Sequence, residues 1–370
     1  MVSNKRKTSK TIKGGMVIVS KIDTIKIGNK QIGAQSPPFI IAEISANHNQ
    51  SLERALTIVE KAAKAGVDAI KLQTYKADTM TINENDKSFM IEDTNSAWKN
   101  KSLYDLYDEA STPWEWHETI FNYCNQLGII GFSSPFDETA VDFLEKLDVP
   151  CYKIASFECT DLPLIKKVAS TGKPMIISTG LCTVAEIEET VQVAKEAGCK
   201  DIILLKCTST YPASSKHTNL RTIPHMQQLF RCHVGLSDHT LGTQVAVTSV
   251  ALGATVIEKH LTLSRDDGGV DAHFSLEPEE MENLVKETKE AWQALGKIKY
   301  GPTEAEKASL QYRRSLYVVK DMEEGEVFTK DNLAVIRPGY GLPPKYYDVF
   351  LGKQVKKNVK RGTPIHWSFI

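Results

Sequence analysis

Two histidines lie at matching positions, each at the carboxyl end of an apolar segment. His239 follows the run Val234–Leu236, and His260 follows the run Thr255–Lys259, 21 residues further along the chain. If the two runs are adjacent strands, which lie ~4.8 Å apart, the imidazoles could share a metal ion. Such a pair would leave coordination positions open, as a Lewis-acid site requires. The alternative is a pair of hydrogen-bonded pocket histidines without a metal.

Lysines recur inside four of the apolar segments, at Lys71, Lys153, Lys206 and Lys259. A single lysine in a strand is usually solvated, but buried ammonium groups must be paired. Hydroxyl groups stand at or near the ends of the apolar segments, some of them on segments without a lysine: Ser133, Ser134, Ser156, Ser178, Thr179, Ser209 and Ser237. We expect this combination to bind a polyanion that carries phosphate and carboxylate groups, through charge-assisted hydrogen bonds.

Eight short apolar runs, each followed by an amphipathic helical stretch, must position these side chains. The runs are Phe39–Glu43, Ala69–Gln73, Ile129–Ser133, Tyr152–Ala155, Met175–Ser178, Ile202–Cys207, Val234–Leu236 and Thr255–Lys259. Eight strand–helix units in roughly 250 residues predict an α/β fold, the (β/α)8 TIM barrel, with its chemistry at the carboxyl ends of the strands. A doubly wound open sheet is the alternative, but no GxGxxG follows the first run.

The composition limits the other possibilities. The 370 residues include 45 Lys and Arg against 46 Asp and Glu, a net charge of −1 that argues against nucleic-acid binding. No apolar run approaches the ~20 residues needed to span a bilayer, and the polar N-terminus does not resemble a signal peptide. Seven scattered cysteines without a CxxC pair indicate a reduced, cytoplasmic protein.

Changes in pattern divide the chain into four segments. Residues 1–36 are expected to be an N-terminal lead-in, unstructured to about residue 15, with a β-rich extension that Met16 opens. The barrel should occupy 37–297 and a linker 298–314, where Gly301 and Pro302 interrupt the pattern. Residues 315–370 form a second domain of marginal size for independent stability, so packing on this barrel or a partner's barrel would explain its survival.

For most of the other potentially reactive residues we expect a structural role. His48 is either catalytic or shapes the first loop, and Trp114–Trp116 is expected to begin a helix on the outside of the barrel. No base stands beside Cys207 in the sequence, so this residue is expected to be a small core filler. The remaining histidines are expected to be superficial or structural: His117, His217, His225 and His233.

Seven motifs, in this order along the chain, carry a family resemblance: Ala42–Gln50, Lys71–Tyr75, Ser133–Phe136, Tyr152–Glu158, Ser178–Gly180, Gly235–Thr240 and Glu258–His260. Together they resemble the sialic acid synthase family, which condenses phosphoenolpyruvate with an N-acylated sugar aldehyde. The C-terminal segment, with Ile336–Gly341, is similar to the antifreeze-like (SAF) domain of that family. The resemblance covers nearly the whole chain after residue 37.

The resemblance implies a role for each motif residue. His239 and His260 would bind a divalent metal, Mn²⁺ or Mg²⁺, with Glu43 as an acidic group near it. Arg337 in the SAF domain would reach the other subunit's active site and hold the N-acyl group, which implies a domain-swapped homodimer. Glu158, Tyr211 and Asp271 match sugar-contacting positions. The phosphoenolpyruvate-binding positions would be Lys71, Ser134, Lys153, Ser156, Ser178, Ser209 and Ser237.

Within the family, three segments are similar to the branch that makes pseudaminic acid: Ser45-Ala46, Thr112–Trp116 and Gly268–Glu280. This similarity implies condensation of phosphoenolpyruvate with 2,4-diacetamido-2,4,6-trideoxy-L-altrose and water, with release of phosphate by C–O cleavage. N-acetylneuraminate or legionaminate synthesis by the same chemistry is the first alternative. A metal-dependent aldolase or hydrolase, and a non-enzymatic carbohydrate-binding protein, are the others.

Overall fold

A computed structural model of the protein describes residues 22–84, 86–92, 98–99 and 101–370. The chain divides into two compact units, Met1–Gly296 and Lys297–Ile370. The expected lead-in to residue 15, and Met16 as the start of a β-rich segment, lie outside the described residues.

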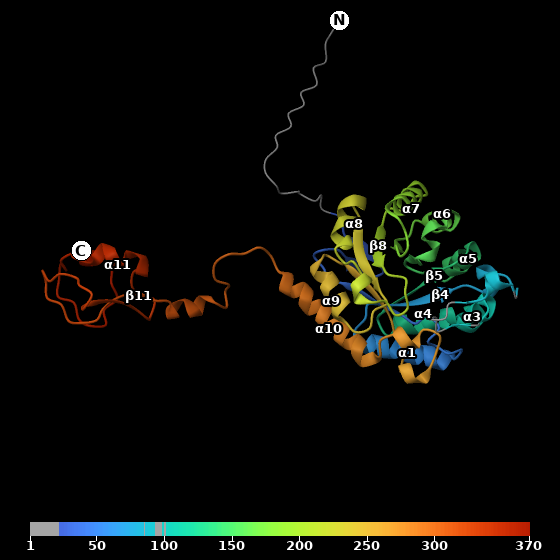
Figure 1. The fold of residues 1–370 in the computed structure, drawn as a ribbon, viewed down its shortest axis with the longest axis horizontal. Helices are drawn as coiled ribbons and strands as arrows, with labels where there is room; N and C mark the ends of the chain where they lie inside the picture. Colours follow the sequence, from blue (N-terminus) through green and yellow to red (C-terminus); the bar gives the residue numbers. More distant parts are fainter. Residues whose placement is uncertain (1–21, 85, 93–97, 100) are drawn as a thin grey trace, which may run out of the picture. The chain divides into compact units, whose positions relative to one another are not determined.

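The first unit is a closed parallel barrel with the strand order β10-β3-β4-β5-β6-β7-β8-β9. The predicted TIM barrel is therefore confirmed, and its helices surround the strands (Figure 1). The strand bounds are β3 (Phe39–Glu43), β4 (Ala69–Thr74), β5 (Ile130–Pro135), β6 (Tyr152–Ile154), β7 (Met175–Ser178), β8 (Ile202–Cys207), β9 (His233–Asp238) and β10 (Val256–His260). Pairing of β10 with β3 closes the barrel and sets His260 opposite Glu43.

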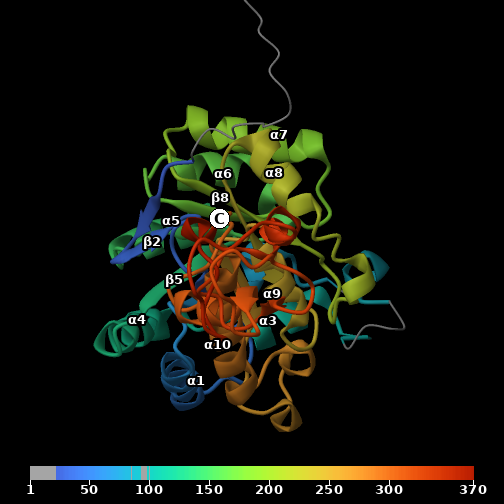
Figure 2. The same cartoon turned by 90° about the vertical axis from the view of Figure 1, so that its left-hand side faces the viewer.

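The helices outside the barrel follow the periodicity of the sequence, and Figure 2 shows them around the strands from a second direction. In α1 (Leu52–Ala65), Ala55, Ile58 and Val59 are buried, and Gly66 ends the helix in the left-handed region at φ 86°. The other helices are α4 (His117–Gln126), α5 (Glu138–Lys146), α6 (Leu162–Ala169), α7 (Val184–Glu196), α8 (Thr222–Phe230), α9 (Gln244–Ala251) and α10 (Pro278–Leu295).

The connection between β4 and β5 is the longest in the barrel. It contains α2 (Ala77–Met80), α3 (Leu103–Ala110) and 3₁₀ turns at Lys87–Phe89 and Trp114–Trp116. The last turn leads into α4, as expected for a helix start. Trp114 stacks on Phe143 of α5, with ring centroids 4.7 Å apart.

A short hairpin precedes the barrel, formed by β1 (Ile25–Ile27) and β2 (Lys30–Ile32) in antiparallel register. Ile27 and Ile32 of the hairpin are fully buried and belong to the same hydrophobic core as the barrel residues. The imidazole of His233 lies within hydrogen-bonding distance of the Asp23 carbonyl, with Nε2 2.9 Å from the oxygen. His233 is therefore a structural residue, as expected.

The second unit has its own small core. Strand β11 (Ser315–Val318) pairs antiparallel with β12 (Leu333–Ile336), and the short helix α11 (Tyr347–Phe350) follows. Leu316, Val318, Phe328, Phe350 and Ile365 are buried within it.

Two further features bear on the expectations from composition. Within the described part of the chain, no helix combines the length and apolar character needed to cross a membrane. All seven cysteines are free thiols, and only Cys182 is partly exposed.

Candidate active site

Four buried charged side chains form the floor of the site inside the barrel. The Lys71 ammonium forms an ion pair with Glu43 on the neighbouring strand, and it lies 3.7 Å from Glu258 Oε1. The Lys153 ammonium lies 3.7 Å from the same Glu258 oxygen. Strands β3, β4, β6 and β10 supply one residue each, so the closed barrel itself brings these charges together.

Burial and mutual attraction set the protonation of the floor. Burial opposes the charge on Lys71, but Glu258 and Glu43 outweigh it and raise the lysine's pKa. Burial likewise opposes ionisation of Glu258, yet Lys153 and Lys71 lower its pKa. Burial dominates at the other two groups: it raises the pKa of Glu43 and lowers that of Lys153. A bound anion would favour the charged form of Lys153, so the floor is suited to a phosphate or carboxylate.

Hydroxyl groups surround this floor at the strand ends. Ser134 accepts a 3.2 Å hydrogen bond from the Lys71 ammonium, and Ser237 donates one of 3.4 Å to Glu258. Ser156 accepts from the Gly180 amide at 3.1 Å. The Ser178 hydroxyl is buried without a partner in the described structure, which leaves it free for a ligand. The structure therefore gathers these four predicted residues around the two lysines.

Ser209 lies beside Ser156, because the hydroxyls of both face the backbone of Gly180. The Ser209 hydroxyl is also 3.7 Å from the thiol of Cys207, which lines the cavity above the floor. The predicted contact of Ser209 with phosphoenolpyruvate remains a prediction.

The two predicted metal ligands stand side by side. The rings of His239 and His260 have centroids 5.4 Å apart. Burial, and then the positive neighbour His239, hold the pKa of His260 well below its usual value, so its ring is neutral. His260 Nδ1 is buried and has no hydrogen-bond partner among the described residues. A neutral imidazole with an unsatisfied nitrogen fits a metal ligand.

The candidate metal site offers two protein ligands. Across the residues that the structure describes, no three His, Cys, Asp or Glu side chains are grouped to hold a metal ion. The protein would thus offer two imidazoles, and water or substrate would fill the other positions, as in open catalytic sites.

Cys207 is buried, as expected of a small core residue, but it also belongs to the site. It lines the cavity, and its thiol lies 3.9 Å from His239 Nδ1. Burial opposes ionisation, but hydrogen bonding and attraction from His239 lower the pKa of Cys207 to about 6. A base does stand beside this thiol, but it comes from the next strand, which the sequence around Cys207 does not reveal.

The expectation that all four strand lysines converge was also wrong for two of them. Lys206 borders a separate surface cavity beside α7 and α8, and its ammonium donates to the Cys207 carbonyl at 2.6 Å. Lys259 is buried against Asp238, with a 2.6 Å ion pair. Successive side chains of a strand point to opposite faces, so the inward positions of Cys207, Glu258 and His260 turn these lysines away from the barrel axis.

Above the floor, a cavity of about 480 Å³ contains the residues expected to contact the sugar. Glu158, Tyr211 and Asp271 all line it. Asp271 accepts a hydrogen bond from Ser45, and the Tyr211 ring lies 4.5 Å from that of His239, centroid to centroid. Arg337 belongs to the second unit, where it is exposed and precedes a cis proline.

Of the two roles considered for His48, catalysis or shaping of the first loop, the structure supports the second. It is buried, its Nε2 lies 3.2 Å from the Thr112 hydroxyl, and its Nδ1 accepts from the Gln50 amide at 3.1 Å. It therefore shapes the first loop and does not line the cavity.

Sequence reasoning missed the apolar side of the cavity. Three polar or aromatic residues that line the cavity were also without an assigned role: Glu258 and Gln73 on the strands, and Phe274 in the last loop. A larger group belongs to the long β4–β5 connection: Met80, Ile91, Trp98, Leu103, Leu106, Tyr107 and Ala110. The spacing of the strand ends gives no signal for these residues, because a long connection reaches the site from outside the strand pattern.

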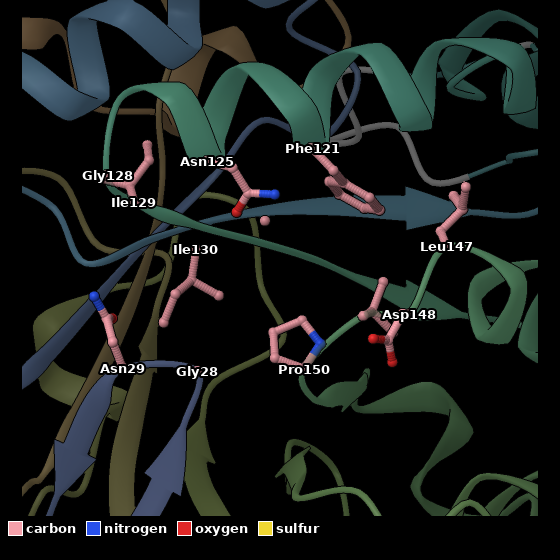
Figure 3. Close-up of a pocket in the computed structure, with 12 residues that line it drawn as sticks. Gly28, Asn29, Phe121, Asn125, Gly128, Ile129, Ile130, Leu147, Asp148 and Pro150 are labelled. Carbon is pink, nitrogen blue, oxygen red and sulfur yellow. The ribbon is translucent and has the colours of Figure 1, made fainter.

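A further cavity, of about 300 Å³, has none of these residues in its lining, and Figure 3 shows the residues that border it. Phe121 and Asn125 of α4 border one side, and Gly28 of the hairpin and Pro150 border another. Its one carboxylate, Asp148, lies 3.2 Å from the Lys173 ammonium. Without lysine, histidine or cysteine in its lining, it offers none of the chemistry of the barrel floor.

A closed parallel barrel with converging ionisable groups over its strand ends defines a (β/α)8-barrel enzyme. The NeuB family model matches residues 58–300, and the SAF domain model matches residues 313–370. The chain belongs to the NeuB family.

Known relatives are similar over most of the chain. A pseudaminic acid synthase of Campylobacter jejuni is 42% identical over 338 residues, 91% of this chain and 97% of the relative. An N,N'-diacetyllegionaminic acid synthase of Legionella pneumophila is 36% identical over 348 residues, 93% of this chain and 97% of the relative. The crystal structure of an N-acetylneuraminic acid synthetase from Leptospira borgpetersenii superposes with a TM-score of 0.70 and 32% identity, covering 79% of this chain and 96% of that one.

Glu158 yields a prediction for stability against pH. Burial raises its pKa from 4.5 to about 7, so the folded protein keeps a proton that the unfolded chain releases at lower pH. The wild type should therefore lose stability as the pH rises from about 4.5 to 7. The Glu158→Gln variant, which stays neutral, should be more stable than wild type by up to ~3 kcal/mol at pH 8.

Urea unfolding of both proteins at pH 5 and pH 8 measures this difference, which should be small at pH 5. Glu188→Gln, at an exposed position of α7, is the matched control and should change neither value. Equal stability of Glu158→Gln and wild type at pH 8 would show that the carboxyl is not held neutral.

Proposed function

We propose that this enzyme condenses phosphoenolpyruvate with 2,4-diacetamido-2,4,6-trideoxy-L-altrose and water, giving pseudaminic acid and phosphate. The observation that carries the proposal is the cavity floor, where Lys71 and Lys153 lie among serine hydroxyls, that of Ser178 without a partner, and next to His239 and His260. The choice of sugar follows the relatives, because identity to the pseudaminic acid synthase is 42%, against 36% for the legionaminic acid synthase.

The floor would bind phosphoenolpyruvate through its two anionic groups. Lys71 and Lys153 would neutralise the phosphate and carboxylate, and Ser134, Ser156, Ser178, Ser209 and Ser237 would donate hydrogen bonds to them. Holding both groups fixes the enol carbon C3 above the floor and lowers the entropic barrier to bond formation. Cys207, beside His239, would exclude water from this side of the cavity.

The reaction balances as follows. C3 of phosphoenolpyruvate attacks C1 of the open-chain sugar, which leaves an alkoxide at the former aldehyde oxygen and a cationic C2. Water adds to C2, and Glu43 is suited to accept one of its protons, because burial raises the pKa of this carboxyl, and that proton would then pass to the alkoxide. Cleavage of the bond between C2 and the phosphate oxygen then releases phosphate, which carries away the proton of the C2 hydroxyl and leaves the 2-keto acid. A divalent metal, Mn²⁺ or Mg²⁺, held by His239 and His260 would polarise the aldehyde.

The sugar would lie in the cavity above the floor. Glu158, Tyr211 and Asp271 offer two carboxyl groups and a phenol to its hydroxyl and amide groups. N-acetylneuraminate or legionaminate synthesis is the second candidate, because relatives with those names also match most of the chain. These reactions would use the same floor and differ only in the sugar. The unpaired cysteines fit a cytoplasmic location for either one.

Phosphate release from phosphoenolpyruvate with a panel of sugars tests this proposal. The panel contains 2,4-diacetamido-2,4,6-trideoxy-L-altrose, N-acetylmannosamine and the diacetamido sugar of D-mannose configuration. We expect kcat/KM to be at least ~10-fold higher for the first sugar, because the cavity above the floor would bind the other sugars with their substituents misplaced. A preference for either of the other sugars would refute the pseudaminate assignment, and no release with any sugar would refute the reaction.

Chelation provides the control for the metal in the same assay. Removal of divalent ions should stop phosphate release, and Mn²⁺ or Mg²⁺ should restore it. Unchanged release after rigorous chelation would remove the metal from the proposal.

Arg337 would complete the site of the other subunit in a domain-swapped homodimer. Arg337→Ala should raise the KM for the sugar with little effect on that for phosphoenolpyruvate, and Lys153→Met should inactivate the floor. When both variants are co-expressed, a mixed dimer has one site with both residues intact. Random pairing should then recover about a quarter of wild-type activity at limiting sugar. No recovery in isolated mixed dimers would contradict the exchange.

A further inference from the structure

The β4–β5 connection gives one side of the cavity an apolar character that the floor lacks. Met80 ends α2, Leu103 and Leu106 belong to α3, and Ile91 lies between the two helices. All four line the cavity, and we call them the apolar wall. Met80, Ile91 and Leu103 are only partly buried, so a ligand in the cavity would cover them further.

Contacts on both sides hold the apolar wall in place. The Tyr104 hydroxyl of α3 donates to Asp78 of α2 at 3.0 Å. The Trp98 indole donates to the Val270 carbonyl at 3.0 Å, which ties the connection to the loop before Asp271. The Tyr75 ring packs edge-on against Tyr107, with centroids 6.0 Å apart. The wall is therefore built into the cavity before a ligand enters.

The chemistry of the wall restricts what can face it. Its four side chains offer no hydrogen-bond donor and no strong acceptor. A ligand hydroxyl placed against them would lose its water partners without replacement, whereas a methyl group there would gain from leaving water. In the proposed function, the charged floor binds the anionic substrate, and the reacting aldehyde lies next to it. The end of the sugar that is remote from C1 would therefore face the apolar wall.

We propose that Met80, Ile91, Leu103 and Leu106 determine sugar specificity by packing on the C6 methyl group and on the methyl of the C4 acetamido group. This inference rests on the proposed function, because it assumes that the aldehyde faces His239 and His260. It assigns recognition of a deoxygenated, acetylated sugar to the β4–β5 connection, separately from the polar residues Glu158, Tyr211 and Asp271.

Sugar binding and turnover together test the wall. The probes are 2,4-diacetamido-2,4,6-trideoxy-L-altrose and its 6-hydroxy counterpart, 2,4-diacetamido-2,4-dideoxy-L-altrose. Wild type should bind the 6-deoxy sugar ~10- to 100-fold more tightly by calorimetry and prefer it by a similar factor in kcat/KM. Ile91→Thr and Leu103→Gln each supply a polar partner and should reduce this preference ~10-fold, with the KM for phosphoenolpyruvate unchanged.

Ile82→Thr is the matched control, because Ile82 lies on the same connection, is 57% exposed and does not line the cavity. Its preference should equal that of wild type. Equal affinity of wild type for the two sugars would overturn the inference without any variant. An unchanged preference in both folded wall variants would also overturn it.

The outcomes separate this inference from the proposed function. Selective binding of the 6-deoxy sugar without phosphate release would refute the proposed reaction and support the wall. Phosphate release without discrimination between the two sugars would support the reaction and refute the wall.

Discussion

The pairing of Lys71 and Lys153 with Glu43 and Glu258 is the interaction on which the rest of the site depends. Ammonium groups inside a barrel are tolerated only when carboxylates compensate their lost hydration, and removal of one partner would leave an uncompensated charge. The four residues come from strands that are distant in sequence, so correct pairing of β10 with β3 is a condition for the site. Correct strand pairing is therefore required both to close the barrel and to bring the charged groups of the site together.

The cavity has two regions with different roles, the charged floor and the apolar wall. The floor is charged and formed by buried side chains of the barrel strands, as suits a reaction in which anionic groups must be held still. The apolar wall comes from a connection outside the barrel strands. A connection can change without disturbing strand pairing. Members of one family could thus keep the condensation chemistry and alter the sugar through this segment.

The sequence was sufficient for the barrel and for most of the floor, because both follow from short-range patterns. Eight apolar runs predicted the eight strands, and the polar residues at their ends predicted the position of the site. Lys206 and Lys259 are exceptions, because successive side chains of a strand alternate in direction and their neighbours Cys207 and His260 face the cavity instead. The Cys207–His239 contact and the apolar wall depend on tertiary packing, which no local pattern encodes.

Calorimetric binding of phosphoenolpyruvate to Lys153→Met and Lys206→Met variants tests the central role of the floor most directly. Both lysines lie within barrel strands, but only Lys153 faces the cavity. Loss of a charged hydrogen bond at Lys153 should weaken binding ~10- to 100-fold, whereas Lys206→Met should bind like wild type. Equal affinities of the two folded variants would contradict the assignment of the floor as the phosphoenolpyruvate site.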